Sequence, residues 1–273
     1  MEAKKLERII ILILALVNLC LLGLLLRSRA EEAASRNARL EMATALLEEN
    51  GITVDPGVDL LQTGPVRYTV VRDLELEEQR MQGLLGNHNS KDLGGGIWFY
   101  RSDRGQIVMR GTGEMDILPA GDMAARDGTP VEESVKLMQR AGVELWVPEG
   151  LTVDPERLPL CCCWAGCPVF NAVMEFCYSE ARLDLVTGTM IFNRETVRDT
   201  AQSLDAVSLL VSFADTVRRE GVICSQLSEL VPGYIMTVGL NGESSLDPVW
   251  RLTTDAGELY VDALTGALTA LPG

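Results

Sequence analysis

Histidine is almost missing from this chain, because His88 is the only one in 273 residues. Histidine is the side chain that most readily exchanges protons near neutral pH, and it is the commonest metal ligand. His88 stands in the polar segment Gly86–Ser90, where a catalytic partner would have to come from elsewhere in the fold. We therefore expect a solvated loop histidine and not a catalytic one.

The short motifs that mark common enzyme classes are also missing. The chain has no G-x-S-x-G nucleophile turn and no H-E-x-x-H zinc motif. Gly94–Gly96 lacks the Lys-Ser/Thr pair of a phosphate loop, and Gly111–Gly113 lacks the third glycine of a dinucleotide fingerprint. The acidic pair Glu132 and Glu133 stands at a helix start, where the helix dipole explains it. These absences predict that the protein is not an enzyme and uses no cofactor.

Basic side chains are scarce beyond residue 39. Residues 1–39 carry seven basic and four acidic side chains, so the remaining 17 basic and 35 acidic ones give the rest a net charge of −18. Such a surface repels nucleic acid and anionic lipid, so we expect neither as a partner of the body of the protein. Hydrophobic residues make up 47% of the chain, enough for one or two domains with packed cores.

A long uncharged run stands near the N-terminus. Ile9–Leu26 holds 18 residues without a charge. As an α-helix rising about 1.5 Å per residue it spans about 27 Å. The hydrocarbon core of a bilayer is about 30 Å thick, so the run predicts a single transmembrane helix in the cell membrane.

Two features favour an uncleaved anchor over a signal peptide. The run is longer than a signal core of about 7–15 residues, and it ends at Leu24–Arg27 without an A-x-A site. Cys20 follows Val17–Leu19, which lacks the small residue of a lipoprotein cleavage site. Basic residues flank both ends of the run, so charge does not decide the orientation. A short tail before a large domain favours residues 1–8 in the cytoplasm and an extracytoplasmic body.

Asn18 places an amide near the middle of this run. An amide in lipid needs a hydrogen-bond partner, and a bond to a neighbouring transmembrane helix is worth about 0.6–2 kcal/mol. Two interpretations stay open: Asn18 contacts a second transmembrane helix, or it bonds to the backbone of its own helix.

The rest of the chain alternates helical patterns with short strands. A helical stalk over residues 27–51, with Gly51 as its C-cap, precedes a first α+β unit over 52–125 and a second α+β region over 126–273. Predicted helices cover Leu74–Leu85, the segment from Thr129 to Ala141, and the segment from an N-cap at Ser203 to Arg219. Predicted strands cover Ile52–Val54, Val66–Arg72, Ile97–Tyr100, Gln106–Arg110, Gly113–Leu118, Leu158–Trp164, Pro168–Tyr178, Leu183–Phe192, Tyr234–Val238, Val249–Thr253 and Glu258–Asp262. A helix followed by an antiparallel meander recurs, so the predicted fold class is α+β, with repeated units packed in series.

Cysteines crowd into one short segment, which holds Cys161, Cys162, Cys163 and Cys167. Three fates stay open. The thiols can be small buried core residues. Cys163 and Cys167 can form a disulfide across a turn if the compartment is oxidising. Cys161, Cys163 and Cys167 can hold a metal, although the second half of a zinc motif is missing.

Three stretches together resemble the YycH/YycI family of two-component-system regulatory proteins of Gram-positive bacteria. The first is the anchor segment 14–22, with an Asn inside it, followed by a helix that leads to Leu-Glu-Glu-Asn-Gly-Ile at 47–52. The second is Gly166–Asn171, which is similar to the family's G-x-P-V-F-N hairpin. The third is Asp247–Gly257 with Tyr260–Gly266, which is similar to the closing repeat that YycI-like proteins share with PepSY-type modules.

The resemblance implies an extracytoplasmic domain of PepSY-like units and no catalysis. It implies that the anchor, with Asn18 as the helix-contact candidate, touches a sensor histidine kinase of the WalK type, and that a paralogous YycH-like protein is a further partner. Phe170, Asn171 and Val249–Arg251 carry over only as structural residues. The cysteine run departs from the family pattern, so the local surface is expected to differ there.

The expected function is therefore a membrane-anchored accessory regulator of a sensor kinase that acts by protein–protein contact. The alternative is a PepSY-type extracytoplasmic binding or inhibitor module that acts on a peptidase or a cell-wall enzyme. A third possibility is an enzyme that uses the cysteine cluster.

Overall fold

The computed structural model describes residues 38–271 except 126, 149, 153, 155, 181, 200 and 240–242, together with residues 18, 19, 21–23, 27 and 35. Among these residues no helix has the length and the apolar character that crossing a membrane requires. The predicted span Ile9–Leu26 lies outside the described residues apart from 18, 19 and 21–23.

Among the described residues, fifteen strands join in one network of backbone pairing, whose main path is β11-β2-β13-β12-β9-β10-β6-β5-β4-β3. The long strand β9 connects the two halves of this path, because its start pairs with β12 and its end pairs with β10. The strands are β1 (Thr53–Val54), β2 (Tyr68–Arg72), β3 (Asn89–Gly94), β4 (Ile97–Ser102), β5 (Gly105–Met109), β6 (Glu114–Pro119), β7 (Leu145–Trp146), β8 (Arg157–Trp164), β9 (Cys167–Ser179), β10 (Arg182–Thr189), β11 (Asn193–Arg198), β12 (Gln226–Val238), β13 (Glu243–Thr254), β14 (Gly257–Asp262) and β15 (Leu268–Thr269).

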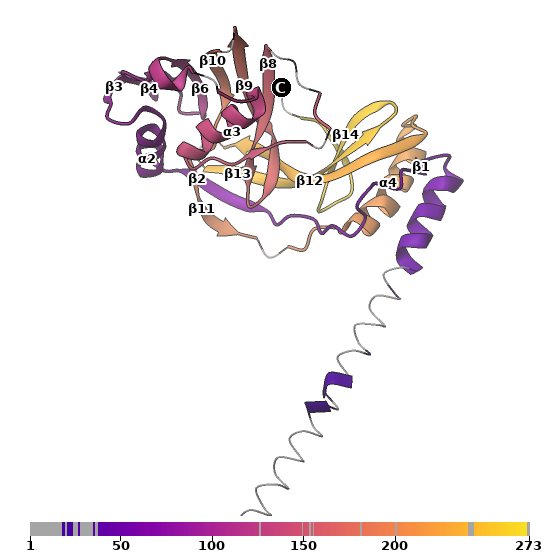
Figure 1. Ribbon diagram of the computed structural model, residues 1–273. Helices are drawn as coiled ribbons and strands as arrows, with labels where there is room; N and C mark the ends of the chain where they lie inside the picture. The colour runs from indigo at the N-terminus through magenta and orange to yellow at the C-terminus, as the bar shows by residue number, and fades with distance from the viewer. Residues whose placement is uncertain are drawn as a thin grey trace, which may run out of the picture.

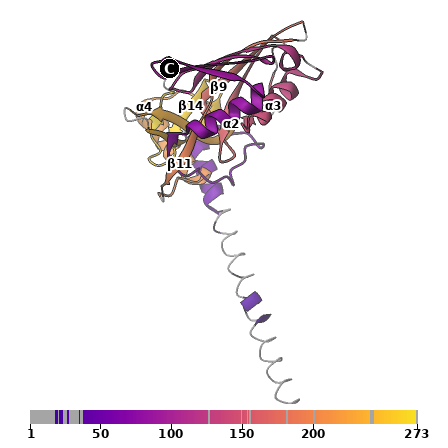
Figure 2. The same cartoon turned by 90° about the vertical axis from the view of Figure 1, so that its left-hand side faces the viewer.

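Helices cover the two halves separately. The helices are α2 (Leu74–Leu85), α3 (Pro130–Arg140), α4 (Ala206–Glu220), the 3-10 turn η1 (Gly121–Met123) and a helix over residues 38–49. Figure 1 shows α2 and α3 over the half that holds β3–β10, and α4 beside the helix of residues 38–49 in the other half. Figure 2 shows α2 and α3 lying side by side.

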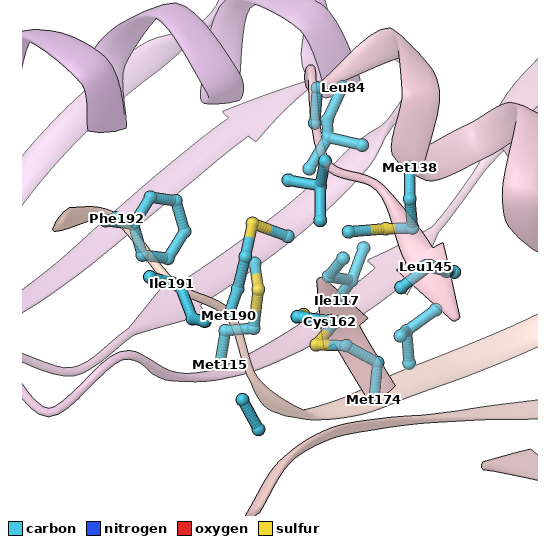
Figure 3. Close-up of a cluster of buried hydrophobic side chains, with 14 of the residues drawn as sticks. Leu84, Met115, Ile117, Met138, Leu145, Cys162, Met174, Met190, Ile191 and Phe192 are labelled. Carbon is cyan, nitrogen blue, oxygen red and sulfur yellow. The ribbon is translucent and has the colours of Figure 1, made fainter. Parts of the chain in front are cut away.

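Two clusters of buried side chains follow this division. The first core lies under α2 and α3, and Figure 3 shows part of it, including Leu84, Met115, Ile117, Met138, Cys162, Met174, Met190, Ile191 and Phe192. The second core lies between α4, the helix of residues 38–49 and strands β12–β14, and includes Ala43, Leu47, Ile52, Leu209, Leu210, Phe213, Leu227, Leu230, Trp250 and Val261. The predicted boundary between residues 125 and 126 falls inside the first core, because α3 and β8–β10 pack on the same cluster as α2 and β4–β6.

Local signals place most of the helix ends. Thr129 and Glu132 form the expected capping box at the start of α3. The helix of residues 38–49 ends as predicted at Gly51, whose φ is +80°, with Ile52 N–H donating to Leu47 O at 2.9 Å. This bond belongs to a Schellman cap, and the side chains of Ile52 and Leu47 also meet in the second core.

The predicted N-cap at Ser203 is wrong. Asp205 caps α4 instead, because its carboxylate accepts the N–H of Ser208 at 2.8 Å. The Ser203 hydroxyl donates to the carbonyl of Pro65, which ties the approach to α4 to the start of β2.

The fold class is mixed α+β, as predicted, but several strands were not expected. Strand β3 is polar and exposed along its whole length, so it shows no apolar alternation. Strand β12 begins eight residues before the predicted Tyr234, because Pro232 and Gly233 interrupt the strand pattern in the sequence. Gly233 is needed there, since a Cβ atom would lie 2.4 Å from the Phe170 ring.

Candidate functional site

A groove opens where the two halves of the sheet meet, and its cavity measures about 560 Å³. One wall is the outer edge of β12, and the opposite wall is β7 with the tip of the β8–β9 hairpin. Its lining residues are Gly57, Val58, Asp59, Gln62, Trp146, Val147, Gly166, Cys167, Pro168 and Ser228–Pro232. Cavities of this size are large enough to bind ligands or short chain segments.

The groove exists because strand pairing on the outer edge of β12 is interrupted. Strand β1 pairs with β12 in parallel at Gln226 and Leu227, and β9 pairs with it in parallel at Tyr234. No described strand pairs with this edge of β12 between those two points.

The hairpin turn explains why β9 does not extend further along β12. Ala165 and Gly166 both have positive φ, 50° and 78°, which is the conformation of a tight two-residue hairpin. Trp164 pairs with Cys167 across this turn, so the chain reverses direction just before it would reach the middle of β12. The sequence predicted both strands and this turn correctly.

An arginine–aromatic cluster supports the wall behind the groove. The Arg251 guanidinium lies 4.7 Å from the centre of the Trp146 ring and 5.5 Å from that of Phe170. It also pairs with Glu229 at 2.7 Å and with Glu258 at 3.3 Å, while only 10% of its side chain is exposed. Stacking on rings and charge pairing hold Trp146 in place against β13.

The lining of the groove is acidic and apolar. Asp59 contributes an exposed carboxylate, Glu229 contributes one that already pairs with Arg251, and no lysine or arginine is among the described residues that line the groove. Trp146 and Val231 contribute partly exposed apolar surface. The groove therefore suits a ligand that is apolar in part and positively charged.

The cysteine run borders this groove, and burial suppresses the ionisation of its thiols. The structure holds Cys161, Cys162, Cys163 and Cys167 as free thiols. Burial raises the pKa of the Cys161 thiol to about 11, and burial raises the pKa values of Cys162 and Cys163 to about 12. A thiol with such a pKa is almost wholly protonated at neutral pH and is a poor nucleophile and metal ligand.

The predicted disulfide between Cys163 and Cys167 is wrong for this fold. Cys163 pairs with Pro168 across the hairpin, and Cys167 pairs with Trp164. Because neighbouring residues on a strand point to opposite faces, the two thiols lie on opposite faces of the sheet. Among the described residues, no group of three Cys, His, Asp or Glu side chains is placed to hold a metal ion.

The expectation of a solvated His88 is also wrong, because only 3% of its side chain is exposed. Its Nδ1 lies 2.8 Å from the carbonyl of Gly86, and its Nε2 lies 3.1 Å from Glu78 Oε1. Its ring packs edge-on against Tyr100, with 5.5 Å between ring centres. The imidazole ring thus connects the C-terminal end of α2 to β4.

A buried carboxylate next to His88 carried no signal in the sequence. Glu77 on α2 is 1% exposed, and it accepts the Tyr100 hydroxyl at 2.8 Å and the Arg72 Nε at 2.9 Å. Burial and the hydrogen bond to Glu77 raise the pKa of Tyr100. Arg72, Glu77 and Tyr100 come from β2, α2 and β4, so this cluster joins three elements of the first core. A glutamate in an acidic helix looks like any solvated charge until the tertiary neighbours are known.

Two residues of the predicted family motif have a clear structural role. The Asn171 side chain donates to the carbonyl of Met236 and accepts its N–H, both at 2.8 Å. The amide thus pairs with β12 as a strand residue would and extends the junction of β9 with β12. Phe170 packs with Ile235 and Val249 on the face of the sheet that carries Arg251.

Asn18, the predicted helix-contact residue, lies in a helical and exposed stretch of the described residues. The partner that it was expected to contact is a second chain, so this expectation stays a prediction.

Comparison with known proteins adds a likeness of fold. No protein-family model matches the chain, and no curated protein matches it. Among solved structures, the chain is similar to an uncharacterized protein from Eubacterium rectale ATCC 33656 with a TM-score of 0.50 and 12% sequence identity. The match covers 82% of this chain and 92% of that one. At this identity the likeness concerns the mixed α+β fold alone.

Proposed function

We propose that the protein is a membrane-anchored extracytoplasmic accessory regulator of a two-component sensor histidine kinase. In this proposal Ile9–Leu26 spans the membrane, residues 1–8 lie in the cytoplasm, and the α+β body is built of PepSY-like units. The protein acts by contact with its partner through the N-terminal helix and the outer domain.

The observation that carries the proposal is the open groove between the two cores. Its lining offers a broken strand edge, an aromatic wall and carboxylates, which are features that recognise another protein. The thiols beside it are protonated at neutral pH, and its described lining residues include no histidine or lysine. Binding, and not chemistry, is the function that this surface supports.

The helix of residues 38–49 gives the proposal a route from membrane to groove. Ala43 and Leu47 on this helix are fully buried against the second core. Strand β12 supplies Leu227 and Leu230 to the same core and forms one wall of the groove. In this proposal, a shift of the N-terminal helix reaches the groove through these packed side chains, so that binding at one end biases the other.

Co-purification tests the proposal. Tagged full-length protein is extracted from native membranes in mild detergent, and the retained proteins are identified by mass spectrometry. We expect a transmembrane sensor histidine kinase, and we expect deletion of this gene to change the autophosphorylation of that kinase in isolated membranes.

The Asn18→Leu variant tests the role of the N-terminal helix, and Asn18→Gln is the matched control that keeps the amide. Loss of the kinase in the leucine variant alone supports a contact through Asn18. Recovery of a secreted peptidase or a wall hydrolase without any kinase would favour the PepSY-type inhibitor. Failure to retain a kinase, together with unchanged kinase output on deletion, contradicts the proposal.

A further inference from the structure

We infer that the groove binds an extended, basic peptide segment of a partner protein, which adds as a strand to the outer edge of β12 between β1 and β9. The inference deepens the proposed function by naming the form of the ligand, and it rests on that function only in taking the partner to be a protein.

The position of the missing strand is defined on both sides. Strand β1 and the start of β9 lie along the same edge of β12, and both run parallel to it. They leave the edge uncovered opposite Ser228–Pro232, since the carbonyl of Pro168 already lies close to Gly233, and at about 3.3 Å per residue this is a length of about 17 Å. An extended segment of about four to five residues fills such a gap in line with its two neighbours.

The protein already satisfies this edge with hydrogen bonds at each end of the gap. The N–H of Asp55 donates to the carbonyl of Leu227 at 2.9 Å, directly after β1. At the other end the Asn171 amide bonds both polar backbone groups of Met236. An extended peptide backbone is the ligand that continues this row of bonds, because it carries donors and acceptors at the strand repeat, although Pro232 inside the gap has no N–H and offers only its carbonyl.

Side chains around the gap select the sequence of the peptide. Asp59 lines the groove with an exposed carboxylate, whereas the carboxylate of Glu229 is partly exposed and already pairs with Arg251 at 2.7 Å, so Asp59 is the group that selects a basic side chain. Trp146 and Val231 offer apolar surface at the same place. Because side chains alternate along a strand, we expect Lys or Arg to alternate with apolar residues in the bound segment.

A second open edge serves as an internal comparison. Strand β3 ends the main path of the sheet, and all six of its residues are exposed. It carries the charged residues Lys91 and Asp92, as expected of an edge that is protected against pairing. We therefore expect the peptide to add as a strand at β12 and not at β3.

The test uses full-length protein in detergent micelles and a phage-displayed library of random dodecapeptides. The library is panned on the wild-type chain and depleted on Ser228→Trp, in which an indole at an exposed position of the lining fills the groove. Enriched peptides are synthesised, and their affinities are measured by fluorescence anisotropy. A second version of each carries N-methyl groups on alternate amides, which removes backbone donors and keeps every side chain.

We expect enriched peptides in which Lys or Arg alternates with apolar residues. N-methylation in one of the two alternate registers and the Ser228→Trp substitution should each weaken binding at least tenfold. Asp59→Lys, at an exposed position, is a second blocking variant in case Ser228→Trp lowers the melting temperature. Ser90→Trp on the exposed edge of β3 should change the affinity less than twofold.

Three results would overturn the inference: no peptide enriched over the depletion step, binding that survives N-methylation in both registers, or an equal loss in Ser90→Trp. If the Ser228→Trp variant still retains a kinase while no peptide binds to the protein, the proposed function stands. The groove is then not the site of that function. Peptides that bind as expected to a chain that retains no kinase support the inference and count against the kinase as the partner.

Discussion

The two cores of this protein are built from different side chains. Eight of the ten methionines lie in the first core. Figure 3 shows Met115, Met138, Met174 and Met190 with the buried Cys162. The buried members of the second core contain no sulfur and are mostly leucine, alanine and valine around Phe213 and Trp250. Methionine is unbranched and flexible, so it fills the irregular space under the neighbouring helices α2 and α3. Branched side chains with few rotamers suit the second core, which holds the helix of residues 38–49 firmly against α4.

Polar burial separates the cores as well. The first core contains the Glu77 cluster with Arg72 and Tyr100, whereas the groove cluster around Arg251 lies between the two cores. We therefore expect the stability of the first core to depend on changes of charge and protonation. The second core instead connects the N-terminal helix to β12 by apolar packing.

The largest effect is expected from Gly83→Ala on α2. A Cβ atom at this position would lie 2.0 Å from the carbonyl oxygen of Arg140, so it would force α2 and α3 apart. Glycine to alanine within a helix normally stabilises by about 1 kcal/mol, but here we expect a loss of about 3 kcal/mol. Urea unfolding measures the change. Gly57→Ala, where nothing lies within 4 Å of the new atom, is the control, and a stable Gly83→Ala variant would show that the helices do not touch.

Asn171→Ala should uncouple the two cores. The substitution leaves the N–H and the carbonyl of Met236 without their partners, which costs about 2 kcal/mol. We expect the unfolding transitions followed at Trp98 in the first half and Trp250 in the second to separate in temperature. Coincident transitions in the variant would mean that other contacts join the halves. Asn171→Asp keeps the acceptor for the Met236 N–H but sets a carboxylate oxygen against the Met236 carbonyl, so at neutral pH it should lose at least as much stability as the alanine variant.

Alkaline pH should weaken the first core in particular. Burial raises the pKa of the Cys162 thiol from 9.0 to about 12, so the folded chain holds this proton more tightly than the unfolded chain. The stabilisation is complete below pH 9 and is lost as the pH rises toward 12. At about pH 10.5 the titration of this thiol has lowered the unfolding free energy by about 2 kcal/mol relative to neutral pH.

Cys162→Val removes this titration and should make the alkaline limb of a plot of unfolding free energy against pH less steep, while Cys161, Cys163 and Tyr100, whose pKa values are also raised, keep the remaining slope. Met190→Leu, also in the first core, changes no titrating group and should shift the curve without changing its slope. Equal slopes for the wild type and Cys162→Val would contradict the assignment.

The smallest effect belongs to the turn beside the groove, which lies in neither core. Ala165 adopts a φ of 50°, which is unfavourable for a side chain with a Cβ atom. We expect Ala165→Gly to raise the unfolding free energy by about 0.5 kcal/mol, because relief of strain exceeds the added freedom of the unfolded chain. Ala120→Gly, at an extended residue with φ of −142°, should lower it instead. Calorimetry on both variants distinguishes the two signs.

Much of the fold could be predicted where one segment contains its own explanation. Helix α2 begins and ends at the predicted residues Leu74 and Leu85, and α3 begins at its predicted cap. Strand β3 and the early part of β12 were missed, because a polar edge strand and a strand with Pro-Gly carry no apolar alternation. The α4 cap was misplaced by two residues, since Ser203 and Asp205 are both good caps and only the contact of Ser203 with Pro65 separates them.

The sequence by itself determined the mixed α+β class, the cap at Gly51 and the tight turn at Ala165–Gly166, because each depends on hydrogen bonds and steric limits within a few residues. Only the tertiary structure decided that His88 is buried and that Cys163 and Cys167 face apart. It also decided that β1 and β9, which are far apart in the chain, leave the middle of β12 uncovered. The groove depends on strand pairing between distant segments, and pairing of that kind follows from the packing of the whole chain.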